Sequence, residues 1–170
     1  MESLRERFKK EGVESVDMKM PERLALLEKT RLGSGFSSSE LQMLACYIDP
    51  WQAKPGTYIC RQGDESEFFC LICRGRVEVL RDDFQHAHKE IATIGPGQTV
   101  GEMAFLDGDF RSASVVVETP VLFLIINRKQ FNLMAEDTPQ LWGKLLMGLT
   151  ITIIKRLRQT SGILAEYLQS

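Results

Sequence analysis

Residues 100–114 read Val-Gly-Glu-Met-Ala-Phe-Leu-Asp-Gly-Asp-Phe-Arg-Ser-Ala-Ser and carry the strongest signal in the chain. A helical turn at the start of this segment would direct unpaired backbone N–H groups at an anion. The planar guanidinium of Arg111 matches two phosphate oxygens, and Glu102 can accept a hydrogen bond from a ribose hydroxyl. Ser112 adds a hydroxyl donor, and the small Ala113 lets the backbone approach closely. The segment therefore predicts a binding site for a sugar phosphate.

Short β-prone runs separated by glycine and proline surround this segment, from Ile48 to Ile126. Residues 76–79 alternate between polar and apolar, whereas residues 68–73 and 121–126 are nearly continuous apolar runs. We therefore expect some strands to have one solvent-exposed face and others to be buried on both faces. About eight strands spaced by roughly 8–12 residues favour a jelly-roll or barrel over a parallel sheet. The fold class is expected to be mainly β with flanking helices.

Helical patterns lie on both sides of the β region. Ser37 as N-cap and Glu40 three positions later form a capping box, which predicts a helix to about Cys46. Residues 128–135 predict a short helix, and Pro139 suits the first turn of a longer one. Residues 1–31, by contrast, are dense in charges of both signs, and we expect them to form a loosely attached helical lead-in.

The segment from Pro139 to Leu168 has no further proline, so about 30 residues can form one helix of roughly 45 Å. Apolar residues recur along it at close to a 3.5-residue spacing. They are Leu146, Ile153, Leu157, Leu164 and Tyr167, with Thr150 and Thr160 as polar members of the same stripe. Because such a helix extends beyond a small barrel, part of the stripe is expected to meet a second copy of the chain. The alternative is that the stripe packs back on its own domain.

The composition and the net charge argue against several classes of function. The formal charge of −2, from 21 Lys and Arg against 23 Asp and Glu, gives no global positive field for nucleic acid. The N-terminus is charged and does not resemble a signal peptide, and the longest apolar stretch, residues 145–154, is too short to cross a bilayer. Four cysteines without an export signal indicate reduced thiols. These features favour one cytoplasmic unit that does not contact a membrane.

The segment 100–114 resembles the phosphate-binding cassette of the cyclic nucleotide-binding domain family, in which Gly-Glu and apolar residues precede Arg-Ser/Thr/Ala-Ala. Residues 55–64 and 69–79 are similar to the first glycine-punctuated strands of that family, and the resemblance covers roughly residues 36–168. It implies a double-stranded β-helix, or jelly-roll, with a long C-terminal helix. It also implies that Glu102 accepts the ribose 2′-hydroxyl, while Arg111 and Ser112 hold the cyclic phosphate. The residues implied to contribute through their backbone are Gly101, Met103, Ala104 and Ala113.

A second resemblance concerns the base. Residues 156–161 (Arg-Leu-Arg-Gln-Thr-Ser) are similar to the long-helix element of the catabolite activator branch of the family, where a Thr-Ser pair touches adenine. The resemblance implies that Thr160 and Ser161 read the base edge, with Arg156 nearby. It implies cyclic AMP as the preferred ligand and cyclic GMP as the second choice, with no cofactor. The long helix would then cover the base and convert occupancy into movement.

This interpretation divides the chain into three parts. They are a helical lead-in at 1–35, a β-roll with its short flanking helices at 36–137, and a long helix at 138–170 that dimerises and acts as a lid. The expected partners are the nucleotide, a second copy of the chain, and an effector protein. An alternative is that Glu102 and Arg111 form only a salt bridge, in a roll that has lost its ligand.

Other functions receive less support from the residues. Activator-like proteins continue from this helix into a DNA-binding domain, so the chain could be the sensor part of such a transcription regulator. Cys70 and Cys73 suggest a metal or redox site, but residues three apart in a strand point to opposite faces. His86 and His88 fall in an expected polar hairpin loop at 83–89 without a nucleophile motif, so no enzyme activity is expected.

Overall fold

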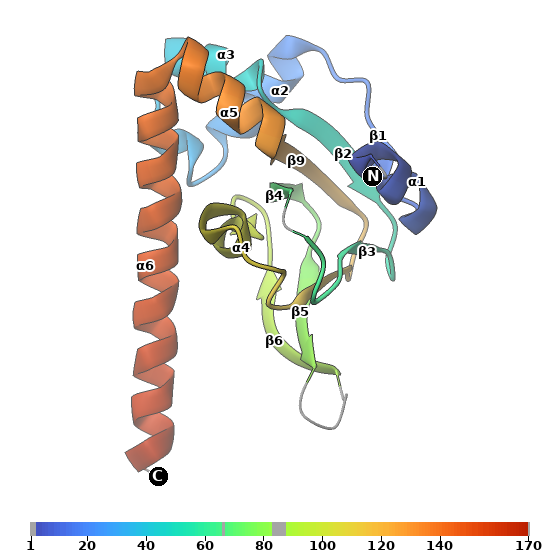
Figure 1. The fold of residues 1–170 in the computed structure, drawn as a ribbon, viewed down its shortest axis with the longest axis vertical. Coiled ribbons are helices and arrows are strands. Elements are labelled where there is room, and N and C mark those ends of the chain that lie inside the picture. The colour runs from blue at the N-terminus through green and yellow to red at the C-terminus, as the bar shows by residue number, and fades with distance from the viewer. Residues whose placement is uncertain (1–2, 66, 83–87, 170) are drawn as a thin grey trace.

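The computed structural model describes residues 3–65, 67–82 and 88–169. Within these ranges, two antiparallel sheets form a roll that is flanked by helices (Figure 1). The strands are β1 (Glu14–Ser15), β2 (Asp49–Ala53), β3 (Tyr58–Cys60), β4 (Phe68–Arg74), β5 (Val77–Asp82), β6 (His88–Ile94), β7 (Thr99–Val100), β8 (Ser114–Val117) and β9 (Val121–Asn127). The helices are α1 (Leu4–Glu11), α2 (Met20–Glu28), the short 3-10 helix η1 (Gly33–Gly35), α3 (Ser38–Ala45), α4 (Glu102–Asp107), α5 (Arg128–Asp137) and α6 (Pro139–Gln169).

The strand order confirms the predicted jelly-roll. One sheet runs β1-β2-β9-β4-β7 and the other β3-β8-β5-β6, with antiparallel pairing throughout the described strands. Strands that are distant in sequence pair with each other, as Phe69 of β4 does with Ile126 of β9. The predicted loop at 83–89 is wrong at its end, because His88 and Lys89 pair with β5 as part of β6; residues 83–87, including His86, lie outside the described residues.

The two faces of the sheet β1-β2-β9-β4-β7 pack into two separate apolar cores. The inner core lies between the sheets and includes Phe68, Cys70 and Ile72 of β4. The outer core lies beneath the helices and includes Phe69 and Leu71 of the same strand. Alternate residues of β4 thus enter different cores, which explains why this strand is a continuous apolar run.

The N-terminal lead-in is attached more firmly than the sequence analysis predicts. Phe8 of α1 is fully buried, and β1 pairs with β2 through Glu14 and Ser15. The expectation of a loosely attached segment is wrong, because one aromatic residue within a charged run anchors the whole helix to the inner core. The Ser3–Glu6 capping box begins this helix, just as the predicted Ser37–Glu40 box begins α3.

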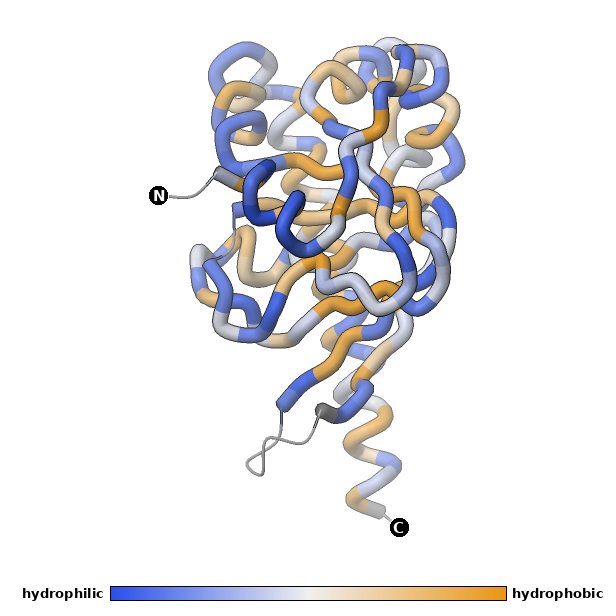
Figure 2. Tube along the Cα trace, turned by 90° about the vertical axis from the view of Figure 1, so that its right-hand side faces the viewer, coloured by the Kyte–Doolittle hydropathy of each residue, from blue (hydrophilic) through white to orange (hydrophobic). Residues whose placement is uncertain are grey.

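The long C-terminal helix is continuous from Pro139 to Gln169, as predicted. Its first half packs on the outer core through Leu141, Leu145 and Leu149, which are all buried. Its second half extends past the roll and carries apolar residues on its surface (Figures 1 and 2). No helix in the described part of the chain combines the length and apolar character needed to cross a bilayer.

Candidate functional site

The turn from β7 into α4 is built on Gly101. This residue is the N-cap of α4 and has a left-handed φ of 84°, a conformation that glycine adopts without steric penalty. A Cβ atom at this position would lie 2.3 Å from Nη1 of Arg111. Gly101 therefore serves two purposes, because it allows the tight turn and leaves room for the guanidinium.

Arg111 lies in the wall of the roll with only 4% of its surface exposed. Its Nη1 donates to the carbonyl of Gly101 at 2.7 Å, and its Nη2 donates to the carbonyl of Phe68. The guanidinium carbon lies 4.7 Å from the centre of the Phe68 ring. Backbone hydrogen bonds to Gly63 and Asp64 fix the main chain of Arg111 to the β3–β4 loop. The buried Nε has no hydrogen-bond partner among the described residues.

Glu102 is fully buried at the start of α4. Its Oε1 accepts a hydrogen bond from Nη1 of Arg156 on α6, and Nη2 of Arg156 donates to the carbonyl of Thr99. Its Oε2 is buried and has no hydrogen-bond partner among the described residues. The salt bridge to Arg111 considered as an alternative does not form, because the two side chains have different partners. The site thus contains one unpaired acceptor and one unpaired donor, each of which costs about 1–3 kcal/mol when buried.

The other predicted residues of the cassette differ in their exposure. Ser112 is exposed and Ala113 half-buried, directly before β8, while Met103 is exposed and Ala104 buried in the first turn of α4. The backbone N–H groups at this helix start have no intrahelical acceptor, because the first helical hydrogen bond is from Phe105 N–H to the Gly101 carbonyl.

The two residues predicted to read the base are not in contact with the cassette. Thr160 and Ser161 are exposed on α6, one turn beyond Arg156. Neither side chain forms a hydrogen bond with residues 101–113 in the described structure. The structure therefore brings together Glu102 and Arg156, and leaves Thr160 and Ser161 facing solvent.

Arg128 is a site-supporting residue that the sequence analysis missed. It begins α5, donates from Nη2 to the carbonyl of Phe105, and lies 4.0 Å from the centre of the Phe105 ring. It therefore holds the end of α4 against α5. An arginine directly after a strand gave no pattern that could have indicated this contact.

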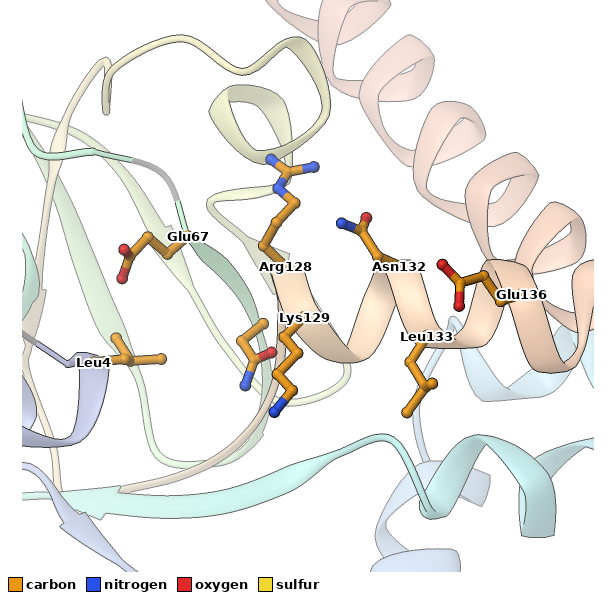
Figure 3. Close-up of a pocket in the computed structure, with 8 residues that line it drawn as sticks. Leu4, Glu67, Arg128, Lys129, Asn132, Leu133 and Glu136 are labelled. Atoms are coloured by element: carbon orange, nitrogen blue, oxygen red, sulfur yellow. The ribbon is translucent and has the colours of Figure 1, made fainter.

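Figure 3 shows a cavity of about 700 Å³ between α1 and the start of α5. Leu4, Glu67 and Leu133 line it, and none of the predicted site residues does. A second cavity of about 570 Å³ lies between α6, the segment 31–36 and the turn 97–99. Arg156 reaches this second cavity, so the helix that contacts Glu102 also borders an open space.

The acidic turn after α4 is exposed. Asp107 and Asp109 both lie at the surface, and the N–H of Asp109 donates to Oδ1 of Asp107 at 3.0 Å. Their carboxylates therefore lie in solvent, as the turn chemistry of Asp-Gly-Asp predicts.

The four cysteines all lie in the described part of the chain and are free thiols. Cys70 enters the inner core while Cys73 packs on the outer core, so the two sulfurs are on opposite faces of β4. Burial raises the pKa of Cys60 and of Cys70, and raises the pKa of Cys73 to about 12. Across residues 3–65, 67–82 and 88–169, no three His, Cys, Asp or Glu residues are grouped in a way that could hold a metal ion.

Comparisons with known proteins agree with this architecture. The model of the cyclic nucleotide-binding domain family matches residues 50–138, about half of the chain. A curated relative, Acetyltransferase Pat of Mycolicibacterium smegmatis, is 35% identical over 114 residues, which make up 65% of this chain and 33% of that protein. The chain thus spans about a third of the length of this relative.

Two solved structures are similar over most of the chain. A cyclic nucleotide-binding domain from Methylobacillus flagellatus KT has a TM-score of 0.83 and 28% identity, covering 98% of this chain and 96% of that one. Catabolite Activator Protein from Thermus thermophilus has a TM-score of 0.70 and 26% identity, covering 80% of this chain and 62% of that one. From the family model, the fold and the cassette together, we conclude that this chain belongs to the cyclic nucleotide-binding domain family.

Proposed function

We propose that this chain is a sensor that binds cyclic AMP, and more weakly cyclic GMP, between the cassette and α6. The observation that carries the proposal is the pair of unsatisfied polar atoms, Oε2 of Glu102 and Nε of Arg111, which are both buried. A ribose 2′-hydroxyl can donate to the first, and a phosphate oxygen can accept from the second. Ser112 and the backbone N–H groups of Met103, Ala104 and Ala113 would complete the phosphate contacts.

Arg156 would convert binding into movement. In the structure it spans from α6 to Glu102 and to the carbonyl of Thr99. A ribose that binds Glu102 competes for the same carboxylate, so the position of α6 would depend on nucleotide occupancy. The ligand would shift an existing equilibrium between two positions of α6 by its differential affinity for them.

The preference for cyclic AMP rests on Thr160 and Ser161. They lie about one helical turn beyond Arg156, so inward movement of α6 would bring their hydroxyls toward a base held next to the cassette. Both residues are exposed, so their hydroxyls are available for contact with a base.

The change caused by nucleotide binding would be transmitted through α6 to another protein. We propose that the chain has no catalytic activity of its own, forms a homodimer through the apolar surface of α6, and acts on an effector protein. Exposed apolar residues occupy the second half of the helix, including Leu157 and Leu164 at 65% and 55% exposure. A contiguous exposed apolar surface of this kind is typical of an interaction site.

Isothermal titration calorimetry with an Arg111→Ala variant tests the proposed function. Loss of the charged hydrogen bonds should remove about 1.5–3 kcal/mol of binding free energy, which is a tenfold to hundredfold weaker affinity for cyclic AMP. Arg74→Ala, which removes an exposed arginine at the end of β4 that lines neither the cassette nor the cavity beside α6, should bind like the native chain. Equal affinities for Arg111→Ala and the native chain would show that Arg111 does not hold the phosphate.

Cyclic GMP and adenosine serve as comparison ligands in the same titrations. The native chain should bind cyclic AMP more tightly than cyclic GMP. Adenosine lacks the phosphate, so its weak binding should be the same in the native chain and in Arg111→Ala. Tighter binding of cyclic GMP would contradict the assigned base preference while leaving the phosphate site intact.

A further inference from the structure

The N-terminal helix α1 packs against the residue that orients Arg111. The ring of Phe8 lies 5.1 Å from that of Phe68 and 4.9 Å from that of Trp51, in edge-to-face contacts. Phe68 in turn accepts a hydrogen bond from Nη2 of Arg111 through its carbonyl. A segment outside the 50–138 match of the family model thus contacts the centre of the candidate site.

Arg7, the neighbour of Phe8, places a second guanidinium at the same ring. Its guanidinium carbon lies 5.7 Å from the centre of the Phe68 ring, where that of Arg111 lies at 4.7 Å. Its Nη2 is buried and has no hydrogen-bond partner among the described residues. Two cations therefore share one buried aromatic residue.

The buried thiol of Cys60 lies close to charged groups of both signs. Burial raises the pKa of Cys60 and the negative charge of Asp64 adds to that rise, while the positive charges of Arg111 and Arg7 oppose it. Both guanidiniums therefore contribute positive potential inside this end of the roll.

The nearest carboxylates already have other partners. Glu102 pairs with Arg156, and Glu11 pairs with Arg61 at 3.0 Å. Asp64 accepts a hydrogen bond from the backbone N–H of Arg61 at 2.8 Å. Glu102 and Glu11 are therefore each paired with an arginine other than Arg7 and Arg111, whereas Asp64 keeps its charge because a backbone amide is neutral. A bound anion would supply an acceptor for the unpaired Nη2 of Arg7.

We propose that Arg7 is an additional anion-binding group of the nucleotide site, which strengthens binding of the cyclic phosphate by adding positive potential beside Arg111. This inference rests on the proposed function, because the anion is the phosphate of the cyclic nucleotide. It makes α1 a part of the site, positioned there by the burial of Phe8 against Phe68.

Titration of cyclic AMP into Arg7→Gln tests the inference, with Arg5→Gln as the matched control. Arg5 lies on the same helix but is exposed, so both variants lose one positive charge. We expect Arg7→Gln to bind about three- to tenfold more weakly in 50 mM salt, and less so in 300 mM salt, since screening weakens charge effects. Arg5→Gln should match the native chain, and Arg7→Lys should recover most of the lost affinity.

The melting temperature without ligand separates an anion-binding role from a structural one. Because Arg7 is half-buried and its buried Nη2 has no hydrogen-bond partner among the described residues, Arg7→Gln should keep a melting temperature close to that of the native chain. An affinity of Arg7→Gln equal to that of Arg5→Gln would overturn the inference, as would a salt-independent loss accompanied by a lower melting temperature. A native chain that binds no cyclic AMP would overturn the proposed function itself, which distinguishes the two failures.

Discussion

At the residue scale, Glu102 and Arg111 occupy buried positions that their chemistry alone would make unfavourable. The charged group of each residue forms at least one hydrogen bond, and one of its polar atoms has no hydrogen-bond partner among the described residues. The sequence pattern selected both residues, since a carboxylate after glycine and an arginine before small residues form a specific motif, and their roles as ligand contacts stay predictions. It could not identify Phe68 and Arg128, because their roles come from carbonyl and ring contacts that depend on the folded chain.

Gly101→Ala tests the close packing of this site. Alanine must adopt a left-handed φ and its Cβ would collide with Arg111, so we expect a loss of about 2–3 kcal/mol in the free energy of unfolding. Gly56→Ala is the matched control, because Gly56 has a φ of 83° but has nothing within 4 Å of the added Cβ. It should lose only about 1 kcal/mol, from backbone strain alone. Urea unfolding of both variants measures the difference, and equal losses would show that Arg111 does not pack against Gly101.

At the element scale, the helices illustrate which features a sequence can predict. The Ser37–Glu40 capping box and Pro139 marked the starts of α3 and α6, because capping and first-turn proline are local chemistry. The attachment of α1 was missed, since it depends on long-range packing of a single residue, Phe8, in a charged segment. The contact of Arg156 with Glu102 was missed for the same reason, although the sequence placed Arg156 near the site.

The exposed apolar residues in the second half of α6 predict that the chain forms a dimer. Leu157→Glu places a charge on the proposed dimer surface, so this variant should sediment as a monomer while the native chain sediments as a dimer. Leu133→Glu is the control, because Leu133 is also an exposed leucine, at 45%, but lies on α5. Sedimentation velocity at matched protein concentrations distinguishes these outcomes. A native chain that remains monomeric at high concentration would exclude the proposed dimer.

At the scale of the whole molecule, elements from both ends of the chain pack around the residues that hold the cassette. Arg156 of α6 contacts Glu102, and α1 packs on Phe68, whose carbonyl accepts a hydrogen bond from Arg111. A ligand bound at the cassette could therefore shift the equilibrium between positions of α6. The alternation and turn patterns were sufficient to predict the jelly-roll, whereas the convergence of distant elements was not visible in any local pattern.

The proposed function depends most directly on the buried Nε of Arg111, which should bind the phosphate of a cyclic nucleotide. Arginine Nε–H resonances can be observed by nuclear magnetic resonance, and the signal of Arg111 is assigned by its absence in Arg111→Lys. Saturating cyclic AMP should shift this signal strongly, because a new charged hydrogen bond forms at an unpaired donor, whereas adenosine should leave it in place. An Arg111 Nε–H signal that does not move when cyclic AMP is bound would show that this atom does not hold the phosphate.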